Sequence, residues 1–254
     1  MESVGAGART GRSALVIERF GLRLVLIAAG LLIAAIPFLL LLILVQSGWE
    51  PLHRLDFNTA DSLNRYIFGR QGQITGWKVV SAVGGPTVFR VAAAVAAVVL
   101  WLLRRRRAAV LVAVTMVGAA ILSGGTKLLV NRIRPALTNP VDQAAGASFP
   151  SGHSLTSLVF VGLALVMVLP LVARRWRPVL VAAGVLIVGT IGFSRLILGD
   201  HFVSDVLGGW LIGVAWLLVV NGALHVAAAP DPGAEQAAPA DALQTGDPDS
   251  QRRV

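Results

Sequence analysis

The chain has 254 residues, of which 56% are hydrophobic and only 14% are charged. Soluble domains contain about 45–50% apolar and about 25% charged residues, so this composition excludes an ordinary soluble domain and indicates a membrane protein. The sequence contains no cysteine, which excludes disulfides and thiolate metal sites. The net charge of +9 does not indicate a nucleic-acid partner, because the arginines lie in short runs between apolar segments, where they report membrane topology.

Six segments are apolar and long enough to cross a bilayer, which requires about 20 residues. The first, residues 24–45, is too long for the core of a signal peptide, and no small-residue cleavage site follows it closely, so we expect a retained helix. A mixed segment separates it from the second span, whose first part contains Gly84-Gly85-Pro86 and is expected to be kinked or interfacial. The second to sixth spans are expected over residues 79–103, 108–130, 154–172, 179–193 and 203–226.

These spans predict an all-α fold, an integral membrane bundle of six transmembrane helices over residues 24–228. Residues 1–23 are expected to form a cytoplasmic N-terminal arm. Residues 229–254 are rich in Ala, Pro, Asp and Gln and cannot bury enough apolar surface to fold, so we expect a disordered cytoplasmic tail.

Short runs of arginine define the expected orientation in the membrane. Such runs follow the second and fourth spans, and further arginines lie in the N-terminal arm. Cytoplasmic loops carry an excess of Lys and Arg, so both termini are expected in the cytoplasm and the connections after the third and fifth spans outside. The arginines concerned are Arg9, Arg12, Arg19, Arg104, Arg105, Arg106, Arg107, Arg174, Arg175 and Arg177.

The first polar cluster is KLLVNRIRP, residues 127–135, at the outer end of the third span. Lys127 and Arg134 are seven residues apart, so a helix through both would place them on one face, with Asn131 between them and Arg132 pointing elsewhere. The following proline disfavours helix at Arg134 and marks the end of the span. Two cations on one stripe are suited to an anion, although each could also reach toward lipid headgroups as an ordinary interfacial residue.

The second cluster is FPSGHS, residues 149–154, at the start of the fourth span. Ser151 is a good N-cap, and Gly152 lets the backbone approach a ligand. The free amides and the dipole of a helix N-terminus favour an anion, and His153 would lie beside it in the first turn. The alternative is an ordinary capped helix start with an interfacial histidine.

The third cluster is SRLILGDHFVSD, residues 194–205, between the fifth and sixth spans. His201 and Asp205 are four residues apart and would be neighbours if the sixth helix has begun, with Asp200 as its N-cap. Asp205 could then fix the tautomer of His201 and leave its Nε2 free. Arg195 would reach the same space from the fifth span. A local His–Asp pair of purely structural use remains the alternative.

Together, the clusters contain the parts of a site for a tetrahedral oxyanion. Three cations would bind phosphate oxygens, one histidine could attack phosphorus, and the other could protonate the leaving oxygen. Because the cations offset the developing charge, the chemistry requires no metal, and we expect no cofactor.

The three strings, in order and at full spacing, resemble the motifs Lys-x6-Arg-Pro, Pro-Ser-Gly-His and Ser-Arg-x5-His-x3-Asp of the type 2 phosphatidic acid phosphatase superfamily. The resemblance covers roughly residues 75–225. It implies a bundle of six transmembrane helices that removes phosphate from lipid phosphates or diphosphates without a metal. It also implies the roles of a nucleophile for His201, its orienting partner for Asp205, a general acid for His153, and a phosphate clamp for Lys127, Arg134, Arg195, Ser151 and Gly152.

The resemblance leads us to expect a membrane lipid phosphatase in a bacterial inner or plasma membrane, with its site facing outside. A polyprenyl diphosphate is the favoured substrate, and phosphatidic acid or phosphatidylglycerol phosphate comes next. A phosphotransferase of the same family, and a non-enzymatic phospholipid binder or transporter, remain alternatives. Vanadium haloperoxidases resemble the same motifs but are soluble, which six apolar spans argue against. The sequence does not define the oligomeric state.

Overall fold

The structure is a computed structural model that describes residue 25 and residues 28–142 and 144–227. The predicted N-terminal arm, residues 1–23, and the predicted disordered tail, residues 229–254, lie outside the described residues. Every regular element in the described part of the chain is a helix, which confirms the predicted all-α class.

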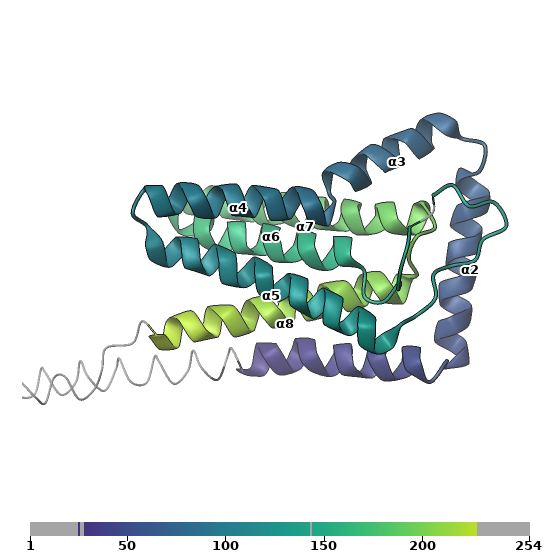
Figure 1. The fold of residues 1–254 in the computed structure, drawn as a ribbon, viewed down its shortest axis with the longest axis horizontal. Coiled ribbons are helices and arrows are strands. Elements are labelled where there is room, and N and C mark those ends of the chain that lie inside the picture. The colour runs from purple at the N-terminus through teal and green to yellow at the C-terminus, as the bar shows by residue number, and fades with distance from the viewer. Residues whose placement is uncertain (1–24, 26–27, 143, 228–254) are drawn as a thin grey trace, which may run out of the picture.

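Six described segments are long and apolar enough to cross a membrane, as predicted. The first is the helix Ala28–Gln46, and the second combines α3 and α4. Short 3-10 turns, Leu169–Leu171 and Arg174–Trp176, lie between the α-helices of the fourth and fifth spans. The labelled helices in Figure 1 are α2 (Glu50–Ile67), α3 (Gln71–Val83), α4 (Pro86–Leu102), α5 (Arg106–Val130), α6 (Gly152–Val168), α7 (Arg177–Ile197) and α8 (Val203–Ala227).

The second span is broken at Gly84-Gly85-Pro86, where the sequence predicted a kink. Gly84 caps the C-terminus of α3, and Pro86 opens α4 after an extended Gly85. Proline lacks an amide hydrogen and suits the first turn of a helix but not its interior, so the chain changes direction here. Figure 1 shows α3 inclined to α4. The predicted start at residue 79 was too late, since helix already begins at Gln71.

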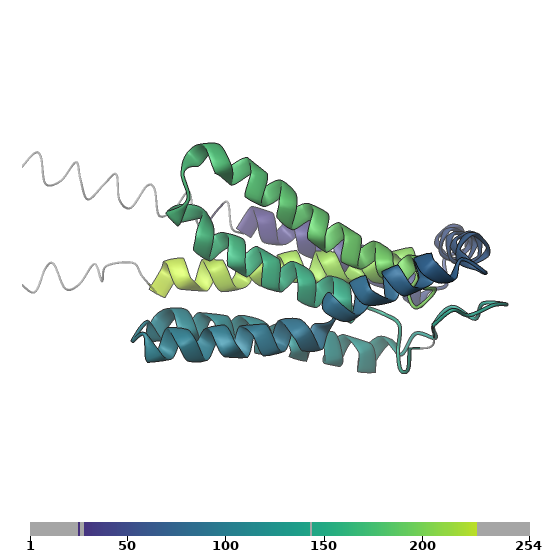
Figure 2. The ribbon, with the colours of Figure 1, turned by 90° about the horizontal axis from the view of Figure 1, so that it is seen from above.

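The helix α2 was not predicted, because its segment is too polar for a membrane span. Its buried residues are Asp56, Ala60, Asn64 and Ile67, which share one face at spacings of three and four residues. Figures 1 and 2 show that α2 crosses one end of the bundle at a steep angle to the spans. The buried face of α2, which includes the polar residues Asp56 and Asn64, therefore packs against α7 and α8.

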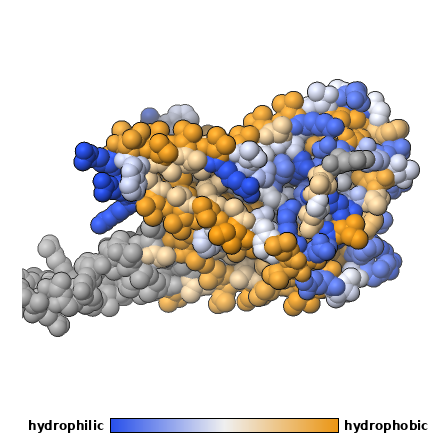
Figure 3. All heavy atoms as spheres, in the orientation of Figure 1, coloured by the Kyte–Doolittle hydropathy of each residue, from blue (hydrophilic) through white to orange (hydrophobic). Residues whose placement is uncertain are grey.

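The helix α6 lies at the centre of the bundle and contacts α4, α5, α7 and α8. Its Leu155, Val159 and Leu163 pack in the main core cluster, together with Met116 of α5 and Ile212 of α8. Apolar side chains outside the core remain exposed along the outer faces of the spans. Figure 3 shows mostly hydrophobic surface over α4 and α5, with hydrophilic residues gathered at both ends. A bilayer would cover such a belt.

The two ends of the bundle differ in chemistry. The α4–α5 turn with Arg104–Arg107, the α6–α7 connection and the last residues of α8 share one end (Figures 1 and 2). The connection of residues 131–151 lies at the opposite end with α2 and the turn before α8. The structure therefore places the arginine-rich connections after the second and fourth spans at the same end, as the predicted topology requires. Which side is cytoplasmic stays a prediction.

Candidate active site

The three polar clusters meet at the end of the bundle that lacks the arginine turns. Lys127 lies in the last turn of α5, and Arg195 in the last turn of α7. The other predicted site residues lie at or just before the starts of α6 and α8, or in the connection after α5. Direct contacts link all three clusters.

The predicted His–Asp pair is present at the start of α8. His201 is 2% exposed and Asp205 is fully buried, and Nδ1 of His201 lies 3.4 Å from Oδ2 of Asp205. Because α8 begins only at Val203, the pair bridges the helix start and does not lie on one helical face. The same Oδ2 accepts a hydrogen bond of 2.9 Å from the amide of Phe202, which fixes the carboxylate.

Burial lowers the pKa of His201 to about 4, although Asp205 acts in the opposite direction. The imidazole is therefore neutral near pH 7. Nη1 of Arg134 lies 3.3 Å from the other ring nitrogen, Nε2, and also donates to the carbonyl oxygen of Asp200 at 2.7 Å. A neutral imidazole with one nitrogen toward a carboxylate and the other beside a guanidinium is suited to attack a bound oxyanion.

Lys127 and Arg134 do not share a helical face, which corrects the predicted stripe. The helix α5 ends at Val130, because Asn131 adopts a left-handed conformation with φ of 43°. Asparagine tolerates this region better than most residues. The chain then runs in a non-helical segment that returns Arg134 to the site. The two cations nevertheless converge, since Nζ of Lys127 and Nη2 of Arg134 lie 2.9 Å and 3.4 Å from the carbonyl oxygen of Ala147.

The N-terminus of α6 has the predicted capped form. The Ser151 side chain accepts a hydrogen bond of 3.4 Å from the amide of Ser154, and the Ser151 amide donates to the carbonyl oxygen of Asp205 at 2.9 Å. This second bond ties the start of α6 to the start of α8. His153 follows in the first turn, with Nε2 at 3.5 Å from the hydroxyl oxygen of Ser81 on α3. Gly152 forms the first residue of the helix between them.

Arg195 reaches the site from α7, as predicted, and is 4% exposed. It donates to the hydroxyl of Ser81 and to the carboxylate of Asp200. The prediction that Asp200 caps the sixth helix was wrong, because α8 starts three residues later. Burial raises the pKa of Asp200 to about 6, although Arg195 opposes this change. Asp200 forms a buried ion pair with Arg195 and so fixes the position of its guanidinium.

The sequence reasoning missed several residues at the site. Arg132 was expected to point elsewhere, yet its Nη1 lies 2.7 Å from Oδ1 of Asp205 and its Nη2 lies 2.8 Å from Oδ2 of Asp56. Ser81 was missed although it contacts both Arg195 and His153. The four-residue spacing of Asp56, Ala60 and Asn64 is the signal that could have placed a polar helical face here.

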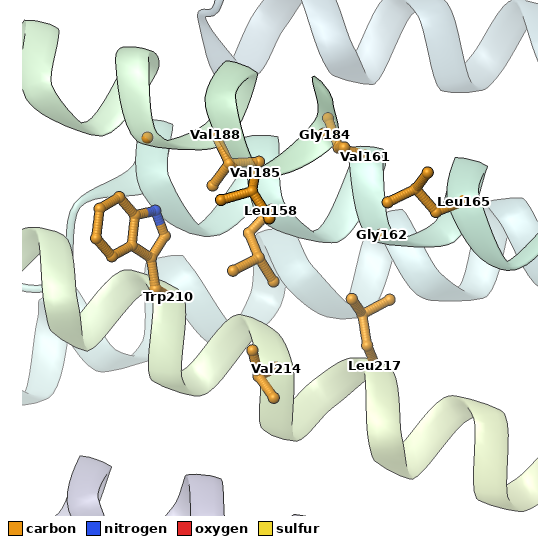
Figure 4. Close-up of a pocket in the computed structure, with 11 residues that line it drawn as sticks. Leu158, Val161, Gly162, Leu165, Gly184, Val185, Val188, Trp210, Val214 and Leu217 are labelled. Carbon is orange, nitrogen blue, oxygen red and sulfur yellow. The ribbon is translucent and has the colours of Figure 1, made fainter. Parts of the chain in front are cut away.

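The apolar grooves between the spans include two that are lined in part by α6. One, of about 660 Å³, is lined by α3, α4, α6 and α7, and includes Val80, Gly84 and Ala92. It adjoins the site, because a Cβ on the next residue, Gly85, would lie only 3.6 Å from Nε2 of His153. The other, of about 420 Å³, lies among α6, α7 and α8, with Trp210 at one end and Leu165 and Leu217 at the other (Figure 4).

Residues 108–226, which include the three clusters, match the family model described as the PAP2 superfamily. This part of the chain is therefore similar to the PAP2 superfamily. Phosphatidylglycerophosphatase B of Bacillus subtilis is 36% identical over 105 residues, which are 40% of this chain and 51% of the relative. Undecaprenyl-diphosphatase of Sulfolobus acidocaldarius is 29% identical over 111 residues, 42% of this chain and 50% of the relative. The matched segment thus spans about half the length of either curated relative.

The overall fold also resembles a solved structure. That structure is described as the first transmembrane PAP2 type phosphatidylglycerolphosphate phosphatase from Bacillus subtilis, and it superposes with a TM-score of 0.64. The comparison covers 75% of this chain and 96% of the solved chain at 20% sequence identity. The likeness shows that the two chains share a transmembrane helical fold, in agreement with the six predicted spans.

Proposed function

We propose that this chain is an integral-membrane lipid phosphatase that acts through a phosphohistidine on His201. The observation that carries the proposal is the setting of this side chain. Its imidazole is buried, with one ring nitrogen toward Asp205 and the other beside the guanidinium of Arg134. The PAP2 match over residues 108–226 and the names of the two curated relatives support the same reaction class.

In the first step, the lone pair of Nε2 on His201 forms a bond to phosphorus, and the bond from phosphorus to the leaving oxygen breaks. The leaving oxygen keeps that electron pair and takes a proton from His153. Lys127, Arg134 and Arg195 hold the non-bridging oxygens, where negative charge develops, and the first amides of α6 with Ser151 and Gly152 complete the clamp.

In the second step, water attacks the phosphohistidine. His153, now neutral, accepts a proton from this water, the nitrogen–phosphorus bond breaks, and its electron pair returns to Nε2 of His201. Inorganic phosphate leaves, and both histidines recover their starting forms. Asp205 holds the imidazole in one tautomer and stabilises its positive charge while the covalent bond exists.

The substrate proposed is a lipid phosphate or diphosphate whose tail stays in the bilayer. The groove beside Gly84 and Ala92 would hold the first part of the tail, because it is apolar and adjoins His153. Polyprenyl diphosphates are the first candidates, and phosphatidic acid and phosphatidylglycerol phosphate follow. The site would face the outside, since the arginine turns occupy the opposite end.

Phosphate release by detergent-purified protein tests the proposal, with a panel of polyprenyl, glycerol and sphingoid phosphates in the presence of EDTA. We expect release from at least one lipid, no effect of the chelator, and loss of release in a folded His201→Ala variant. Lipid binding without turnover would identify a binder or transporter. Transfer of labelled phosphate to a second lipid in preference to water would identify a phosphotransferase.

A further inference from the structure

A buried network of ion pairs extends from Asp205, which faces Nδ1 of the proposed nucleophile His201. Arg132 bridges two carboxylates, with Nη1 at 2.7 Å from Oδ1 of Asp205 and Nη2 at 2.8 Å from Oδ2 of Asp56. Both carboxylates are fully buried, and the Arg132 side chain is 14% exposed. The three residues come from α2, from the segment after α5, and from α8.

Ser204 closes this network. Its hydroxyl donates to Asp56 and accepts a hydrogen bond of 2.6 Å from Nη1 of Arg132. Its amide donates to Oδ1 of Asp56 at 3.0 Å. Asp56 therefore satisfies a free amide in the first turn of α8, which otherwise would lack an intrahelical partner. The Arg132 guanidinium also lies 4.3 Å from the ring centroid of Phe202, which restricts it further.

The two oxygens of Asp205 have separate partners. Oδ1 contacts Arg132, whereas Oδ2 faces Nδ1 of His201 and accepts from the amide of Phe202. Because both oxygens of Asp205 are held, rotation of its carboxylate is restricted, and the orientation of His201 depends on Arg132 as well. Arg132 neutralises one of the two buried carboxylates, which keeps the pair of like charges compatible with burial.

We infer that Arg132 and Asp56 are positioning residues for the reaction, which act on His201 through Asp205. This inference rests on the proposed function, since it assigns His201 as the nucleophile. Neither residue is expected to contact substrate. Replacing the hydrogen-bond partners of metal ligands lowers activity by about 10-fold to 100-fold, and we expect a loss of the same order for these partners of Asp205.

Steady-state kinetics of Arg132→Lys and Asp56→Asn test the inference in the full-length protein. We expect kcat to fall on the order of 10-fold to 100-fold with KM near that of the parent, because substrate contacts are intact. Asp61→Asn is the matched control, since Asp61 lies on the same helix in an exposed pair with Arg65. It should retain the parent kcat.

A second measurement separates positioning from general structural damage. In an Asp205→Asn background, Arg132→Lys should have little additional effect on kcat, because its action passes through Asp205. If Arg132→Lys or Asp56→Asn does not fold, Ser204→Ala takes its place, because this variant keeps both Arg132 and Asp56. It should lower kcat and leave KM unchanged. Folded variants with the parent kcat, a rise in KM alone, or an undiminished loss in the Asp205→Asn background would overturn the inference. If the parent releases no phosphate from any lipid, the proposed function has failed instead.

Discussion

Nη1 of Arg134 lies 3.3 Å from Nε2 of His201, although 67 positions separate the two residues in the sequence. The contact joins the first and third motifs, and it places a forked cation beside the nitrogen proposed to attack phosphorus. A phosphate held by this guanidinium would lie next to the nucleophile. The geometry thus links the binding of the anion to the attack on it.

Arg134→Lys should lower kcat/KM by about 10²-fold to 10³-fold, because an ammonium keeps the charge but loses the fork that matches phosphate oxygens. Arg65→Lys is the control, since Arg65 forms only an exposed pair on α2. Initial rates at several substrate concentrations measure the effect. Parent-like kinetics of Arg134→Lys would remove this residue from the clamp.

The pH profile should reflect a buried, neutral His201. Its pKa is lowered to about 4, whereas an ordinary histidine has a pKa near 6.5. Attack requires the neutral ring, so kcat/KM should fall as pH decreases through about 4. The measurement is kcat/KM against pH, with the ionisation of the substrate determined separately by ³¹P NMR and divided out. An acid limb near 6.5 would contradict the buried setting of His201.

The apolar groove next to His153 should decide how lipid tails bind. Ala92→Phe would fill this groove, so we expect a higher KM for a long-chain lipid phosphate and an unchanged KM for a short-chain one. Gly189→Phe is the matched control, because it fills the second groove among α6, α7 and α8. Should Gly189→Phe have the larger effect, the tail would lie in the groove of Figure 4.

The topology can be tested without removing native thiols, since the chain contains no cysteine. Gly69→Cys lies between α2 and α3 at the end that holds the site, and Arg105→Cys lies in the α4–α5 turn at the other end. A membrane-impermeant maleimide added to intact cells should label the first variant and not the second, because arginine-rich turns stay in the cytoplasm. The reverse pattern would place the site inside.

The sequence predicted the spans and the composition of the site better than its geometry. Apolar runs of about 20 residues have few alternatives to membrane helices, and the described residues contain the six spans that were predicted. The end of α5 was not predictable from Pro135 alone, because Asn131 already leaves the helix four residues earlier. The resulting turn is what moves Arg134 off the face of Lys127 and brings Arg132 to Asp205.

The sequence analysis did not predict the helix α2 or its Asp56, for a different reason. This segment has no apolar run long enough for a membrane span, so a search for spans passes over it. Its partners, Arg132 and Ser204, are 76 and 148 residues away, and such contacts depend on the tertiary structure. Asp200 was misassigned because a helix that started two residues earlier would have had it as its N-cap.

Covalent trapping of phosphate tests the central claim most directly. A ³²P-labelled lipid phosphate, mixed with excess protein and quenched within the first turnover, should leave acid-labile, alkali-stable label on the parent chain. Folded His201→Ala should carry no label, because the attacking nitrogen is absent. Label on the parent that persists undiminished in His201→Ala would contradict the assignment of His201 as the nucleophile.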